Sequence, residues 1–162
     1  MFFFGEKKKP SCGLVYATQN GSILPLSEMP DEVFADKVLG DGVCLIPADG
    51  MVYSPVDGVV ETVADSRHAY GLVASDGAGI MIHIGVDTVE LAGRGFQAKV
   101  RVGQRVKIGD SLCKVDLSVL RDAGYHVHTA VILTNLDRFQ ITEIHTGDGT
   151  AKEAIVFRYQ KR

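Results

Sequence analysis

The chain has 162 residues, of which 46% are hydrophobic and 23% charged, a composition that fits one ordinary globular domain and excludes wholesale disorder. Its formal net charge of −3 argues against a nucleic-acid partner, because nucleic-acid binding favours a concentrated basic face. No apolar run is long enough to span a membrane, no secretory signal is recognisable, and Cys12, Cys44 and Cys113 lack disulfide or metal spacing. We therefore expect free thiols and a cytoplasmic location.

The first 20 residues are predicted to be a flexible leader. An apolar tip at Phe2–Phe4 is followed by Lys7–Lys9 and a proline, without a sustained apolar pattern. This leader would contain at most one short strand, near Leu14–Ala17. The alternative reading is a membrane-surface anchor made of the three phenylalanines and three lysines, although six such residues alone give marginal affinity. The sequence then predicts a single domain over residues 21–162.

From residue 21 onward the pattern is that of an all-β protein. Short apolar or alternating runs are separated by Asp-Gly and Gly-Asp pairs, which supply the positive φ of tight turns. Many short strands at even spacing are typical of a sandwich or barrel. Strands are expected at 23–26, 42–46, 51–53, 59–63, 70–74, 80–84, 96–100, 105–108, 112–115, 127–133 and 155–159, and short helical turns within Pro30–Leu39 and Asp116–Tyr125.

Two of the five histidines are predicted to meet. His83 lies at the end of an apolar run, two residues before Gly85, and His68 precedes the strand expected at 70–74. If a hairpin forms around Ser75–Gly79, counting outward from the turn places His68 within a residue or two of His83. Cross-strand neighbours have Cβ atoms about 4.5–5.5 Å apart, so one ring could orient the other or stabilise charge on it.

Other interpretations of the histidines stay open at this point. His83 alone could be a satisfied core histidine, and His68, His83 and Asp87 together could hold zinc. His126-x-His128 with His83-x-x-x-Asp87 has the formal spacing of lysostaphin-type zinc peptidases, which act outside the cytoplasm. We expect His126 and His128 at a strand end away from His83. The turn pattern around Pro55 and Gly103 also resembles biotinyl and lipoyl carriers, but their lysine tripeptide is missing.

One long motif gives a specific resemblance. Residues 77–96 read GAGIMIHIGVDTVELAGRGF, and residues 30–42, 54–58 and 103–110 fit the same pattern. Together they resemble the enzyme IIA components, glucose family, of the phosphoenolpyruvate-dependent sugar phosphotransferase system, over roughly residues 21–162. The resemblance implies a barrel-sandwich (duplicated hybrid motif) of many short antiparallel strands. It implies neither a cofactor nor a metal.

The resemblance also implies a role for each matching residue. His83 would take a phosphoryl group on Nε2 from the phosphocarrier protein HPr and pass it to a cysteine of an enzyme IIB domain. His68 would stabilise the phosphoryl oxygens, and Ser66 would orient His68 by a hydrogen bond. Regulatory protein targets are a family habit, and a non-phosphorylated regulatory module of the same fold is the alternative function. The partner-docking face would contain Asp31, Phe34, Met81, Asp87 and Glu90.

Overall fold

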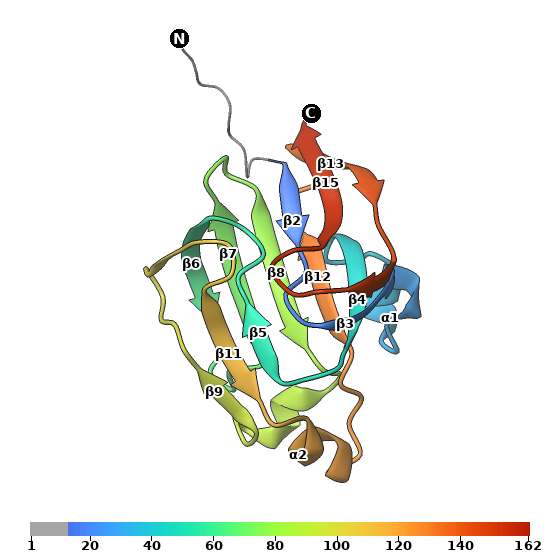
Figure 1. Cartoon of the computed structure of the whole chain (residues 1–162), viewed down its shortest axis with the longest axis vertical. Helices are drawn as coiled ribbons and strands as arrows, with labels where there is room; N and C mark the ends of the chain where they lie inside the picture. The colour runs from blue at the N-terminus through green and yellow to red at the C-terminus, as the bar shows by residue number, and fades with distance from the viewer. Residues whose placement is uncertain (1–12) are drawn as a thin grey trace.

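The computed structural model describes residues 13–162, and its strands account for most of the regular structure (Figure 1). Two short α-helices and two 3₁₀ turns interrupt the strands: η2 (Leu26–Glu28), α1 (Glu32–Ala35), η3 (Thr88–Leu91) and α2 (Leu117–Asp122). The strands are β2 (Leu14–Tyr16), β3 (Gly21–Pro25), β4 (Asp41–Pro47), β5 (Met51–Tyr53), β6 (Gly58–Val63), β7 (Ala69–Ala74), β8 (Gly79–Ile84), β9 (Phe96–Ala98), β10 (Arg105–Val106), β11 (Ser111–Val115), β12 (Thr129–Leu133), β13 (Phe139–Ile144), β14 (Gly147–Gly149) and β15 (Ile155–Lys161).

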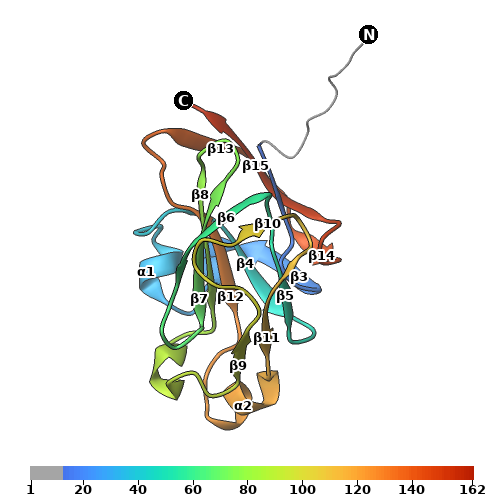
Figure 2. The same cartoon turned by 90° about the vertical axis from the view of Figure 1, so that its left-hand side faces the viewer.

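These strands form three antiparallel sheets. The large sheet has the order β10-β6-β7-β8-β12-β4-β3-β14, and two three-stranded sheets have the orders β5-β11-β9 and β13-β15-β2. Figure 2 shows α1 outside the large sheet and the β5-β11-β9 sheet on its other side. Within residues 13–162 none of the sheets closes on itself, so the expected all-β architecture is confirmed as a sandwich.

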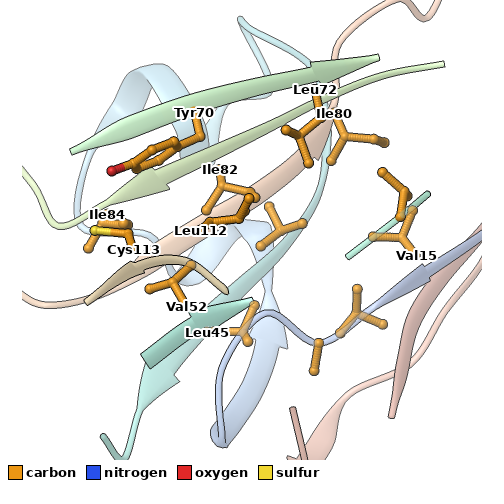
Figure 3. Packing of buried hydrophobic residues seen from close by; sticks show 14 of the residues in the cluster. Val15, Leu45, Val52, Tyr70, Leu72, Ile80, Ile82, Ile84, Leu112 and Cys113 are labelled. Atoms are coloured by element: carbon orange, nitrogen blue, oxygen red, sulfur yellow. The ribbon is translucent and has the colours of Figure 1, made fainter. Parts of the chain in front are cut away.

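The alternation of side chains along β8 positions the functional residues. Ile80, Ile82 and Ile84 point inward and are almost fully buried, whereas Met81 and His83 face outward. Figure 3 shows the three isoleucines in the core with Leu112 and Cys113 of β11. Burying isoleucine side chains stabilises the fold by roughly 1.5–3 kcal/mol each, and this fixes the strand register.

A second, smaller cluster covers the outward face of the large sheet. Phe34 of α1 packs there with Met29, Val86 and Ile132. Because both faces of β12 are covered, all five of its residues are buried. α1 itself is held by its N-cap, where Asp31 accepts a hydrogen bond from the backbone N–H of Val33 at 2.9 Å. The Phe34 ring is therefore held beside the end of β8.

Part of the predicted leader belongs to the folded domain. Residues 1–12, including Phe2–Phe4 and Lys7–Lys9, lie outside the described residues. β2 pairs with β15, and Val15 and Ala17 are fully buried, so residues 14–20 belong to the folded domain. The short strand expected near Leu14–Ala17 is confirmed as β2, but the assignment of residues 14–20 to a flexible leader was wrong because their partner strand lies at the other end of the sequence.

Other differences from the predicted elements are small. α1 and α2 are four and six residues long, within the expected ranges. β13 and β14 were not predicted, although in β13 Phe139 and Ile141 alternate with polar residues as strand residues do. No helix within residues 13–162 has the length and apolarity needed to cross a membrane.

Candidate functional site

The site is built around His83 at the end of β8. Its ring lies 5.0 Å from the His68 ring in an edge-to-face arrangement and 4.7 Å from the Phe34 ring, measured between centroids. The hairpin of β7 and β8 brings the histidines together, since Ala69 pairs with His83 in the register. The expected meeting of His68 and His83 is therefore confirmed, with an offset of one residue.

One hydrogen bond determines which nitrogen of His83 is free. Nδ1 lies 3.0 Å from the carbonyl oxygen of Gly85, and a carbonyl can only accept, so Nδ1 carries the proton. Nε2 of a neutral ring then keeps its lone pair. Gly85 makes this approach because it turns the chain back with φ of 81°. The sequence indicated that a glycine lies close to the His83 ring, but only the structure shows that its carbonyl oxygen contacts Nδ1.

The surroundings keep both imidazoles neutral. Burial and, to a smaller extent, the neighbouring His68 lower the pKa of His83 to about 4. The hydrogen bond to Gly85 and the carboxylates of Asp31 and Asp87 act in the opposite direction. Burial also lowers the pKa of His68. A neutral ring with an unprotonated Nε2 is the form that can act as a nucleophile.

The lowered pKa of His83 predicts a specific dependence of stability on pH. An unfolded histidine takes up a proton near pH 6.5, whereas folded His83 does so only near pH 4. Between these values the unfolded chain binds more protons than the folded chain. The contribution of His83 to the stability of the folded state is therefore complete above pH 6.5 and falls on acidification towards pH 4. We expect a loss on the order of 3 kcal/mol over this window.

Urea unfolding of the wild type and of His83→Gln at several pH values measures this effect. The variant should have the shallower decrease between pH 6.5 and 4, because it lacks the titrating ring. Parallel pH profiles for the two proteins would contradict a lowered His83 pKa.

His68 is placed as predicted, but its predicted hydrogen bond is not formed. The side chain is 8% exposed, its ring lies 6.5 Å from the Phe96 ring, and its buried Nδ1 has no partner. Ser66 lies in the turn where the N–H of Arg67 donates to the carbonyl of Ala64, and no hydrogen bond joins it to His68. Phe96 was quoted in the motif but not predicted as a neighbour of His68.

The five predicted docking residues lie on or beside three elements, α1, β8 and η3. Phe34 contacts the ring directly, Met81 faces outward from β8, and Asp87 and Glu90 are exposed at η3. Asp31 caps α1 and is partly exposed. The structure adds exposed apolar side chains that were not predicted on α1, the turn after it, and η3: Val33, Val38, Leu39 and Val89. The elements that hold the predicted docking residues thus present exposed apolar side chains together with an acidic margin formed by Asp31, Asp87 and Glu90.

His126 and His128 lie closer to this site than expected. The backbone N–H of Gly85 donates to the carbonyl of His128, and that of Val86 donates to the carbonyl of His126. The two rings are 5.5 Å apart. Their strand end therefore adjoins the loop after His83, and the expectation of a remote position was wrong. No group of three or more ligating side chains close enough for a metal occurs within residues 13–162, which removes support from both zinc interpretations.

Comparison with known proteins defines the class of this domain. Its fold matches the glucose permease IIA from Mycoplasma capricolum with a TM-score of 0.82 and 34% sequence identity, covering 89% of this chain and 93% of that chain. Residues 14–139 match the family described as phosphoenolpyruvate-dependent sugar phosphotransferase system, EIIA 1. The chain belongs to this family, whose members are phosphotransferase components.

A curated relative extends the comparison to a larger protein. The chain is 43% identical over 142 residues to the glucose-specific EIICBA component of the phosphotransferase system of Staphylococcus saprophyticus. The match covers 88% of this chain and 21% of the relative. The chain thus spans about a fifth of the length of that relative.

Proposed function

We propose that this domain is a phosphoryl carrier in sugar uptake that accepts phosphate on Nε2 of His83. The observation that supports it best is the hydrogen bond from Nδ1 of His83 to Gly85, which leaves Nε2 as the free nucleophile. The donor is phospho-HPr, and the acceptor is a cysteine of an enzyme IIB domain. We place the exchange in the cytoplasm. Specificity for a sugar is not a property of this site.

Transfer to His83 requires little rearrangement of protons. The Nε2 lone pair forms a bond to phosphorus while the phosphorus–nitrogen bond of phospho-HPr breaks, and that electron pair returns to the HPr ring. Positive charge grows on the His83 ring, where the Gly85 carbonyl and the carboxylates of Asp31 and Asp87 favour it. In the second step the Nε2–phosphorus bond breaks as a cysteine thiolate of the IIB domain attacks. Catalysis rests on positioning and charge stabilisation, with an already activated donor.

We assign the second histidine to the phosphoryl oxygens. The His68 ring is edge-on to His83 at 5.0 Å, so a ring N–H can reach a group bound at Nε2. Ser66 is our proposed partner for the buried Nδ1 of His68, since an unpartnered buried nitrogen costs about 1–3 kcal/mol. A change of the Ser66 rotamer would be needed to form this bond.

Phosphorylation in a defined mixture tests the proposal. The full chain is incubated with phosphoenolpyruvate, enzyme I and HPr, then weighed by intact mass spectrometry at neutral pH. The expected product carries one acid-labile phosphoryl group and does not form when HPr is omitted. An unmodified chain under conditions where HPr is phosphorylated would favour the non-phosphorylated regulatory module.

Substitutions at Asp31 separate its charge from its role as a cap. Asp31→Asn keeps a good N-cap and removes the charge, whereas Asp31→Ala removes both and costs about 1 kcal/mol of stability. If the acidic margin meets basic residues of HPr, both variants should raise the KM for phospho-HPr, with a smaller effect at high salt. Steady-state transfer assays and urea unfolding measure the two effects. An unchanged KM in Asp31→Asn would remove this residue from the docking face.

A further inference from the structure

His126 and His128 form a pair that the phosphoryl relay does not use. Val127 between them belongs to the main core, so the side chains of His126 and His128 point away from the core. The pairing of Ala130 with His83, extended by the bond from Gly85 to His128, places His128 on the outward face of the large sheet with His83. The two imidazoles are thus presented together beside the phosphoryl site.

Neither ring is occupied by a hydrogen bond within the described chain. His128 is partly buried and its Nδ1 is enclosed, so Nε2, for which no hydrogen bond is formed, is the nitrogen that a ligand can reach. His126 is exposed, so its ring can turn about its side-chain bonds. By contrast, the exposed His145 is engaged by Glu143 through a 2.8 Å contact. The His126–His128 pair therefore has nitrogen lone pairs available for a ligand.

The spacing of the rings suits one metal ion. With metal–nitrogen bonds of about 2.0–2.1 Å, two imidazole centroids at a tetrahedral ion lie about 5.2 Å apart. The observed separation between the His126 and His128 centroids is 5.5 Å. Imidazole pairs favour Zn²⁺, Ni²⁺ and Cu²⁺ over hard cations such as Mg²⁺. Because residues 13–162 offer no group of three ligating side chains, water would complete the coordination.

We propose that His126 and His128 form a two-imidazole chelate for a divalent transition metal ion, next to the phosphoryl site but separate from it. A bound ion would fix the two residues whose carbonyls hold Gly85 and Val86. This inference does not depend on the proposed phosphoryl function.

Isothermal titration with Zn²⁺ and with Ni²⁺ tests the chelate. The titration uses the full chain with Cys12→Ser, which removes a thiol outside the described residues. We expect one ion per chain, with affinity at least an order of magnitude weaker in His126→Gln and in His128→Gln. His145→Gln is the matched control and should bind like its parent. Circular dichroism and thermal unfolding establish that each variant is folded.

The His68–His83 pair is the competing site, because its rings are also close. A His68→Gln, His83→Gln double variant should retain the ion if the chelate is at His126 and His128. Loss of binding in that double variant, with binding kept in His126→Gln and His128→Gln, would overturn the proposal. Equal affinity of the parent chain and the His126→Gln, His128→Gln double variant would also overturn it.

Discussion

Replacing His83 by glutamine is expected to abolish phosphoryl acceptance from phospho-HPr. Glutamine retains a polar side chain of similar size, but its amide nitrogen has no lone pair available to attack phosphorus. The lost function is specific to Nε2, which the hydrogen bond from Nδ1 to Gly85 leaves unprotonated in the wild type. Intact mass spectrometry after incubation with phosphoenolpyruvate, enzyme I and HPr should detect no phosphorylated variant.

His68→Gln should separate the two halves of the relay. Its His83 nucleophile remains, so acceptance of the phosphoryl group is expected to persist. Removing a group that stabilises transition-state charge costs about 10²–10³ in rate, and we expect that loss in transfer to the IIB domain. Rapid-quench measurement of each step distinguishes the roles. The His83 pKa should rise in this variant, because the like-charge effect of His68 is removed.

The exposed His145 provides a control for both substitutions. It lies in the loop between β13 and β14 and contacts Glu143, so His145→Gln should accept and pass on phosphate at wild-type rates. A phosphorylated His83→Gln protein would show that the acceptor is another residue. Normal onward transfer by His68→Gln would remove the proposed role of His68.

Local sequence was sufficient to predict the central pair. The turn between β7 and β8 is short, and the alternation along both strands fixes the register, so counting residues brought His68 opposite the end of β8. The long motif around His83 predicted the family. The first inference depends on contacts between residues close in the chain, and the second on the order of residue types along it.

Contacts between distant segments could not be predicted in the same way. Phe34 reaches His83 only because α1 packs on the outward face of the large sheet with Met29 and Ile132. β2 is ordered by pairing with β15. The Ser66–His68 bond stays a proposal, since the family pattern gives residue types but not side-chain rotamers.

Gly85→Ala is expected to damage both the fold and the site. Gly85 has φ of +81°, which strains any other residue, and an added Cβ would meet the Cγ2 atom of Thr88 and approach the His126 carbonyl oxygen at 3.1 Å. Thr88 is fully buried and its hydroxyl donates to the Ile84 carbonyl, so it cannot move aside cheaply. Backbone strain and overpacking together should lower the free energy of unfolding by about 2–5 kcal/mol.

Gly103→Ala and Gly124→Ala isolate the part of this effect due to strain. Both glycines have φ near that of Gly85, at +90° and +88°, but an added Cβ meets nothing within 4 Å. They should lose about 1–2 kcal/mol each and accept phosphate normally. In Gly85→Ala the displaced carbonyl no longer holds Nδ1 of His83, so acceptance per folded molecule should fall as well. Urea unfolding and single-turnover phosphorylation of all three variants compare these effects; equal behaviour would mean that the Gly85 turn does not position His83.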